Sequence, residues 1–165
     1  MKGKTRRRER GVALIWTAIF MVVFLGFVGL STDLGYSLWV AGQLQTAADA
    51  AAMAGAQTLV QNQAGVGAEA ILIAGRNTAA GQAVILTANN NNNAGGDIVL
   101  GNFNTTTRVF TPTTTGPNAV KVVAAFAAGA PNGPLGLFFG PVFGVDNVNI
   151  SRTAKTASSH NPSTS

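Results

Sequence analysis

The sequence predicts an α+β protein in which a long N-terminal transmembrane and stalk helix precedes a small antiparallel β-sheet domain. The first observation is an uncharged, apolar run directly after a basic N-terminus. The second is a helical repeat of apolar and small residues that continues past this run to about residue 61. The third is a change to two-residue alternation after residue 97, which is typical of strands with one buried face.

The apolar run predicts a transmembrane helix over residues 11–32. Val12 to Leu30 are 19 residues, of which 12 are Leu, Ile, Val or Phe, and no charge occurs from Gly11 to Thr32. At helical rise these residues span about 28 Å, the thickness of the hydrocarbon core of a bilayer. The partner predicted for this helix is therefore the lipid bilayer. The residues that we assign to the span are Val12, Leu14, Ile15, Trp16, Phe20, Leu25, Phe27 and Leu30.

The charges on the two flanks predict the orientation of this helix. Residues 1–10 hold six basic residues and one acidic residue, whereas residues 11–165 hold five of each and are neutral. An excess of Lys and Arg marks the cytoplasmic side, so the N-terminus is expected in the cytoplasm and the remainder of the chain outside it. With the excess charge confined to this segment, nucleic-acid binding is not expected. The topology signal consists of Lys2, Lys4, Arg6, Arg7, Arg8 and Arg10.

Two other interpretations of the apolar run are weaker. A cleaved signal peptide usually has an apolar region of about 7–15 residues that ends at a small-residue site. Here the run is longer, and Gly29-Leu30-Ser31 is a poor match to such a site. A buried core helix would rarely begin with six basic residues.

Residues 33–62 predict an extracytoplasmic stalk that continues the same helix. Apolar and small residues recur at helical spacing, and alanine, the strongest helix former, dominates residues 47–56. We expect one helix from about Gly11 to Gln61, roughly 75 Å long. One face of the stalk is made of small residues that would permit close approach of another helix, namely Ala47, Ala48, Ala51, Ala52 and Gly55.

The rest of the chain divides into three predicted parts. Residues 63–96 contain a second helix at about 68–81, a short strand at 84–87 and an Asn- and Gly-rich loop with nothing to bury. Residues 97–157 form the β-rich ectodomain, with a hairpin at 98–103 and 108–111 and strands near 120–126 and 147–151. Residues 158–165 form a polar, disordered tail.

An apolar segment interrupts the strands of the ectodomain between residues 131 and 145. It is either a loop that covers the core or an exposed patch that recruits a partner. We favour the core for at least one of Phe138 and Phe143, because so weakly charged an ectodomain could hardly expose all these residues. The patch comprises Leu135, Leu137, Phe138, Phe139 and Phe143.

The residues needed for catalysis or metal binding are missing from the sequence. Cysteine is absent, the single histidine is His160 in the tail, and neither a phosphate loop nor a Ser-His-Asp set is recognisable. The sequence therefore predicts no enzyme activity, no cofactor, no metal and no small-molecule substrate.

Most of the chain, from Arg10 to Ala157, resembles the Flp pilus-assembly TadE/TadG-like family of tight-adherence secretion systems, and the resemblance is strongest up to about Ala56. Three elements carry the resemblance: Arg10-Gly11-Val12-Ala13 before the apolar helix, Asp33-Leu34-Gly35 after it, and Leu44-Gln45-Thr46-Ala47-Ala48-Asp49-Ala50-Ala51 in the stalk. The resemblance implies a pilin-like, bacterial inner-membrane protein that contacts other pilus-assembly or pseudopilin-like proteins. It also implies a structural polar contact for Asp49, which would otherwise be a solubilising residue. Asp33 is expected to mark the outer end of the span. The family and helix-packing residues are Asp33, Gly35, Leu44, Gln45, Ala47, Ala48, Asp49, Ala51, Ala52 and Gly55.

Two alternatives to an uncut membrane anchor stay open. Gly11 followed by Val12 could be a prepilin-peptidase site, and cleavage there would yield a minor pseudopilin. Pilins and TadE-type pseudopilins usually carry Glu five residues after the cut, where this chain has Trp16, so retention is favoured. The other alternative is a stand-alone membrane-tethered binding module.

Overall fold

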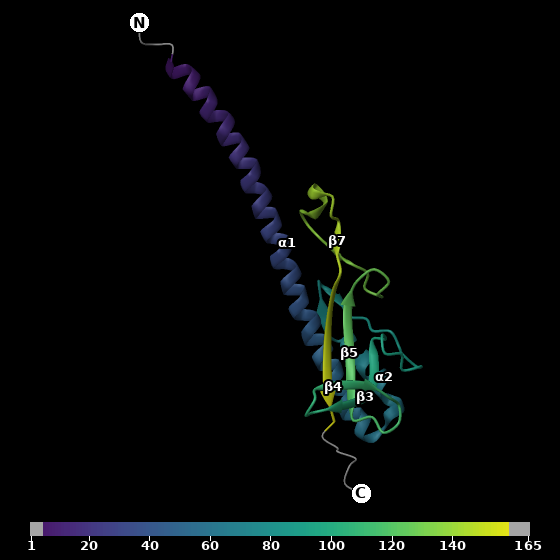
Figure 1. The fold of residues 1–165 in the computed structure, drawn as a ribbon. Helices are drawn as coiled ribbons and strands as arrows, with labels where there is room; N and C mark the ends of the chain where they lie inside the picture. Colours follow the sequence, from purple (N-terminus) through teal and green to yellow (C-terminus); the bar gives the residue numbers. More distant parts are fainter. Residues whose placement is uncertain (1–4, 159–165) are drawn as a thin grey trace.

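The structure, a computed structural model, describes residues 5–158, with side chains from residue 11 onward. A single helix, α1 (Thr5–Gln61), runs for 57 residues, about 85 Å, and its N-terminal part extends away from the rest of the chain (Figure 1). The sheet and the second helix pack along its C-terminal part. The expected continuous helix and the α+β fold class are confirmed. The predicted disordered tail lies, apart from Ser158, outside the described residues.

The second helix is shorter than expected. After the short η1 (Gln63–Gly65), α2 (Val66–Gly75) ends six residues before the expected limit. The side chain of Asn77 donates to the carbonyl of Ile73 at 2.8 Å and occupies one of the last helical acceptors. The chain then reverses in a two-residue hairpin whose turn residues, Ala80 and Gly81, have positive φ. The hairpin strands are β1 (Thr78–Ala79) and β2 (Gln82–Ala83).

A four-stranded antiparallel sheet has the order β4-β3-β5-β8. Its central strand, β5, alternates in burial, and Val120, Val122, Ala124 and Phe126 are all fully buried. This is the one-faced pattern that the alternation predicted. The strands are β3 (Ile98–Asn104), β4 (Val109–Pro112), β5 (Ala119–Phe126) and β8 (Ile150–Ala157).

The stalk part of α1 and the sheet share one hydrophobic core. α1 packs against α2, β5 and β8, and its buried stripe begins at Val40 and ends at Leu59. The segment that we expected to stand out as a stalk is therefore the central helix of the ectodomain. Its core residues include Val40, Leu44, Ala47, Ala48, Ala51, Ala52, Ala56 and Leu59.

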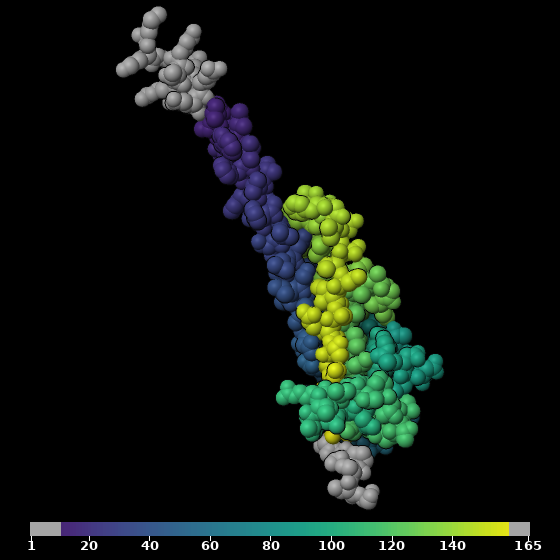
Figure 2. Space-filling model, viewed as in Figure 1, coloured from purple at the N-terminus to yellow at the C-terminus, as the bar shows by residue number. Residues whose placement is uncertain are grey.

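A second small sheet projects from the ectodomain toward the N-terminal part of α1. It pairs β6 (Leu135–Gly136) with β7 (Asn147–Val148), and between them the chain makes the short helix η2 (Gly140–Phe143). This region lies beside the middle of α1, where it forms the lobe next to the helix in Figure 2. The segment between the two strands ends with the exposed Asp146, and its uncharged part, residues 137–145, is called the apolar loop below.

The segment expected as a strand at residues 84–87 is extended but pairs with no strand. Val84 and Leu86 are buried, which accounts for the alternation in the sequence. Val84 N–H donates to the carbonyl of Asn77 at 3.0 Å, and two further N–H groups donate to side chains: Ile85 N–H to Asn132 at 2.8 Å and Thr87 N–H to Asp97 at 2.7 Å. For these two groups, side-chain acceptors thus replace the missing neighbouring strand.

The Asn-rich loop is more ordered than expected. Asn92 uses both ends of its amide on the backbone of Leu100, accepting from the N–H at 2.7 Å and donating to the carbonyl at 3.0 Å. Asn89 bonds to the backbone of Asn93 and Ile98. Most of the loop is exposed to solvent, as expected for a solvated loop, and the amides of Asn89 and Asn92 also bond to the edge of β3.

Candidate functional site

The part of α1 before the ectodomain is long and apolar enough to cross a membrane. Its most apolar 18-residue window has a mean hydropathy of 2.5, and none of that window is buried against the rest of the chain. All eight side chains assigned to the span are exposed. The helix is continuous through Gly11 and Val12, the bond considered for processing. The side chains of the basic topology signal lie outside the described residues.

Asp33, the first charge after the span, is buried under the apolar loop. Its side chain is only 5% exposed. The backbone N–H of Phe138 donates to Oδ1 at 2.8 Å, and that of Phe139 donates to Oδ2 at 3.0 Å. The carboxylate therefore binds the start of η2 to the helix. This contact could not be predicted from the sequence, because its partners are backbone groups more than one hundred residues away.

Below this contact, the apolar loop packs on two glycines of the span. A Cβ placed on Gly29 would lie 3.0 Å from the Cβ of Phe139, and one on Gly26 would lie 3.7 Å from the ring of Phe143. Above the contact, the rings of Tyr36 and Phe138 meet edge to face, with centroids 4.9 Å apart. The loop thus follows α1 for about ten residues, from Tyr36 back to Gly26.

The expectation that Phe138 or Phe143 belongs to the core is wrong. Phe138 is 65% exposed and Phe143 is 58% exposed, while Leu135 alone among the five patch residues is fully buried. Leu137 is half-buried and Phe139 is exposed over its outer side. The core is closed by β6 and the α1 stripe, so the loop between β6 and β7 extends past the end of the core.

The small-residue face of the stalk is occupied within the chain itself. Ala47, Ala48, Ala51 and Ala52 have no exposed area, and Gly55 meets Val66 of α2 and Val120 of β5. A Cβ at Gly55 would lie 3.3 Å from both valines. The expected approach of a partner helix to this face is thus corrected: small side chains bring the chain's own α2 and sheet close.

The other motif residues lie on different sides of α1. Leu44 is buried in the core, whereas Gly35 has open space beside it. Asp49 is on the exposed side, where its carboxylate accepts from the side chain of Gln45, one turn earlier, at 2.9 Å. Within the described residues Asp49 thus bonds only to its own helix, and a contact with a partner stays a prediction.

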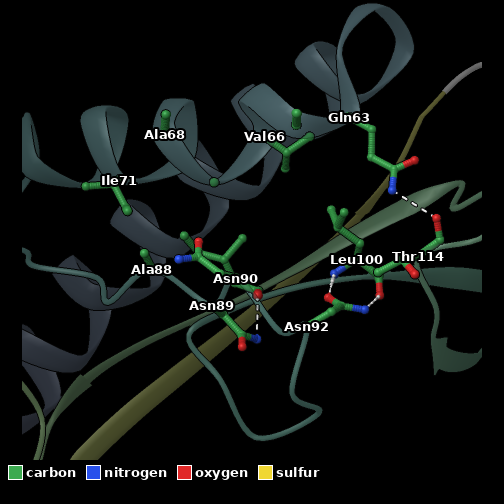
Figure 3. Close-up of a pocket in the computed structure, with 13 residues that line it drawn as sticks. Gln63, Val66, Ala68, Ile71, Ala88, Asn89, Asn90, Asn92, Leu100 and Thr114 are labelled. Carbon is green, nitrogen blue, oxygen red and sulfur yellow. Dashed lines mark hydrogen bonds between the residues drawn. The ribbon is translucent and has the colours of Figure 1, made fainter.

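A groove of about 630 Å³ lies between α2 and the Asn-rich loop. Figure 3 shows Val66 and Ile71 of α2 on one side of it and the asparagine amides on the other. Gln63 bridges one end by donating to the carbonyl of Thr114 at 2.9 Å. The lining contains no ionisable side chain, so this groove offers neither an acid-base pair nor charged metal ligands.

These surfaces define a class of protein: a small α+β ectodomain built around the C-terminal part of one helix whose N-terminal part can cross a membrane. A family model described as Flp pilus-assembly TadE/G-like matches residues 11–58, which confirms the resemblance predicted from the sequence. The matched segment lies wholly within α1. Comparisons with curated proteins and with solved structures gave no match.

The apolar helix and the family match together fit a single-pass membrane protein related to Flp/Tad pili. The matched family concerns pilus assembly and is not a known class of enzyme. A family of this kind suggests contacts with the membrane and with other pilus components.

Proposed function

We propose that this protein is a membrane-anchored structural component of a Tad-type pilus assembly system, kept uncut in the inner membrane with its ectodomain on the outer side. The observation that carries the proposal is the composition of α1. One continuous helix supplies an exposed, uncharged apolar half and the central core stripe of the ectodomain, and the family match covers both. Such a helix joins the ectodomain directly to the bilayer, with no linker between them.

The orientation in this proposal is supported by the charge distribution. The excess of basic residues precedes the span, and the residues after it are neutral overall. We expect protease added to spheroplasts to degrade the ectodomain while the protein resists extraction by carbonate. Protection of the ectodomain in intact spheroplasts would contradict the orientation.

The mass of the mature N-terminus separates this proposal from the pseudopilin alternative. We expect protein purified from its native membrane to retain the residues before Val12. A mature chain that begins at Val12 would instead identify a processed pseudopilin able to enter the filament. The Trp16→Glu variant is a useful companion, since it restores the carboxylate that pilin-type assembly uses.

The role in assembly is tested by deletion and complementation in the encoding bacterium. We expect loss of surface pili on deletion, and recovery with the intact gene but not with a variant that lacks residues 11–32. Unchanged piliation in the deletion strain would favour the third possibility, a stand-alone tethered binding module, for which the groove beside α2 is the available cavity.

A further inference from the structure

The apolar loop lies at a depth that the span itself defines. Phe143 reaches Gly26, which precedes Leu30, the last apolar residue of the predicted span, by four residues. At helical rise this places the tip of the loop about 6 Å below the outer end of the span. A loop that accompanies a lipid-exposed helix to this depth cannot remain wholly in water.

The side chains of the loop suit contact with lipid. Phe138, Phe139, Val142, Phe143 and Val145 are all exposed, with Val142 the most exposed at 79%. Residues 135–145 include no charged residue. This apolar surface is continuous with that of the span, because Phe139 and Phe143 pack directly on it.

Most N–H groups of the loop find partners within the protein, which lowers the cost of moving its backbone out of water. Of its eight N–H groups, six have a partner inside the protein; Pro141 has no N–H. Asp33 accepts hydrogen bonds from two of these six N–H groups. The loop in turn covers the Asp33 carboxylate, so this charge does not face lipid. The bonded N–H groups are those of Leu137, Phe138, Phe139, Val142, Gly144 and Val145.

Aromatic residues mark the level at which the loop leaves α1. Tyr36 packs against Phe138 and lies 6.1 Å from the exposed ring of Trp39, centroid to centroid. Tyr and Trp gather at the membrane–water interface. Val12 to Trp39 spans about 42 Å, the full thickness of a bilayer with its headgroups.

From these observations we propose that the apolar loop is a second membrane-contacting element, inserted into the outer leaflet beside the span. Asp33, covered by the loop, lies within the membrane interface instead of marking its edge. The lipid-facing surface then continues to Trp39, next to the first core residue, Val40. Two attachment points fix the tilt and rotation of the ectodomain on the membrane, which one helix could not do.

The proposal rests on the span crossing the membrane, and its test includes a control for that. The chain has no cysteine, so single cysteines can be introduced and given a nitroxide spin label. The test site is Val142→Cys, with Val22→Cys in the span and Val109→Cys in β4 as controls; all three valines are exposed. The full chain is placed in vesicles of phosphatidylethanolamine and phosphatidylglycerol, with oxygen and a water-soluble nickel complex present on both sides.

We expect the label at residue 142 to collide mainly with oxygen, as at residue 22, and to lose most of the nickel collisions seen at residue 109. Nickel collisions at 142 equal to those at 109 would overturn the proposal. If the label at 22 meets nickel as well, the failure lies in the span. The measurement is repeated at increasing lipid-to-protein ratio. Protection at 142 that disappears on dilution would show that a second copy of the chain covers the loop, and would also overturn the proposal.

Discussion

Asp33 shows how one side chain can have different roles in sequence and in space. In the sequence it is the first charge after an apolar run, as expected for a residue at the end of a span. In the structure it is buried and accepts hydrogen bonds from two backbone N–H groups of the apolar loop. Hydrogen bonds to an ionised group are the stronger kind, so Asp33 is the main polar contact that holds the loop to α1.

We expect Asp33→Ala to release the apolar loop without unfolding the ectodomain, because the core begins seven residues later. Two part-buried donors would lose their acceptor, at a cost toward the low end of about 1–3 kcal/mol each. Hydrogen exchange at the amides of Phe138 and Phe139 should accelerate by at least about tenfold. Asp49→Ala is the control, since that carboxylate is exposed and bonds only to Gln45. Slow exchange at both amides in Asp33→Ala would contradict the contact.

Two asparagines of the same run, Asn92 and Asn90, differ in what their side chains contact. Asn92 makes two hydrogen bonds to Leu100, whereas Asn90 is exposed. We expect Asn92→Ala to lower the free energy of unfolding by about 1–2 kcal/mol and Asn90→Ala to change it little. Chemical denaturation of both variants measures this. If the Asn92→Ala and Asn90→Ala variants are equally stable, the hydrogen bonds of the Asn92 amide do not contribute to stability.

At the scale of elements, the packing of α1 on the sheet depends on small side chains. Ala52 is fully buried, and Gln57 is on the opposite, exposed side of the same helix. We expect Ala52→Leu to cost about 1–3 kcal/mol by overpacking, while Gln57→Leu should leave stability nearly unchanged. Thermal unfolding compares the two. A stable Ala52→Leu variant with impaired pilus assembly would instead indicate that this face binds a partner helix.

The pairing of β5 with β8 places two lysines opposite each other. Lys121 faces Lys155 in the register, and burial together with the charge of Lys155 lowers the pKa of Lys121. Between this lowered pKa and the ordinary lysine pKa, the unfolded chain binds more protons than the folded one. Stability therefore rises with pH across that window, and the penalty is fully present below it.

We expect Lys155→Thr to raise stability at neutral pH and to flatten this rise, because it removes the facing charge. Thermal unfolding of the wild type and the variant from about pH 7 to about pH 10.5 covers the window. Lys155→Arg, which keeps the charge, should behave like the wild type. An identical pH dependence in the Thr variant would leave burial as the sole cause of the shift.

At the scale of the whole molecule, the ectodomain is a unit built around the C-terminal part of α1. Every α1 residue in the core lies at or beyond Val40. We expect a chain that starts at Leu34 to unfold cooperatively, but with an apolar loop that proteases cut readily, since Asp33 and the span are gone. A chain that starts at Asn62 lacks the central helix and should not fold. Cooperative melting of that shorter chain would show that the sheet and α2 are stable alone.

The sequence by itself determined the elements whose signals are local or periodic. Charge asymmetry and an uncharged run define the helix, and two-residue alternation defines β5. The alternation at 147–151 predicted one strand where the structure has β7 and the start of β8. In each case the residue pattern is repeated along one segment and reflects what that segment faces, lipid or core. The family resemblance, which depends on the order of residues along α1, was equally accessible.

Only the tertiary structure decided what the predicted faces touch. The small-residue stripe meets the chain's own α2 and sheet, Asp33 lies beneath a loop one hundred residues away, and Phe138 and Phe143 lie outside the core. Composition states that a face is small or apolar, but it does not state which surface covers it. That choice depends on the pairing of β6 with β7, which projects the apolar loop beyond the core and onto the helix.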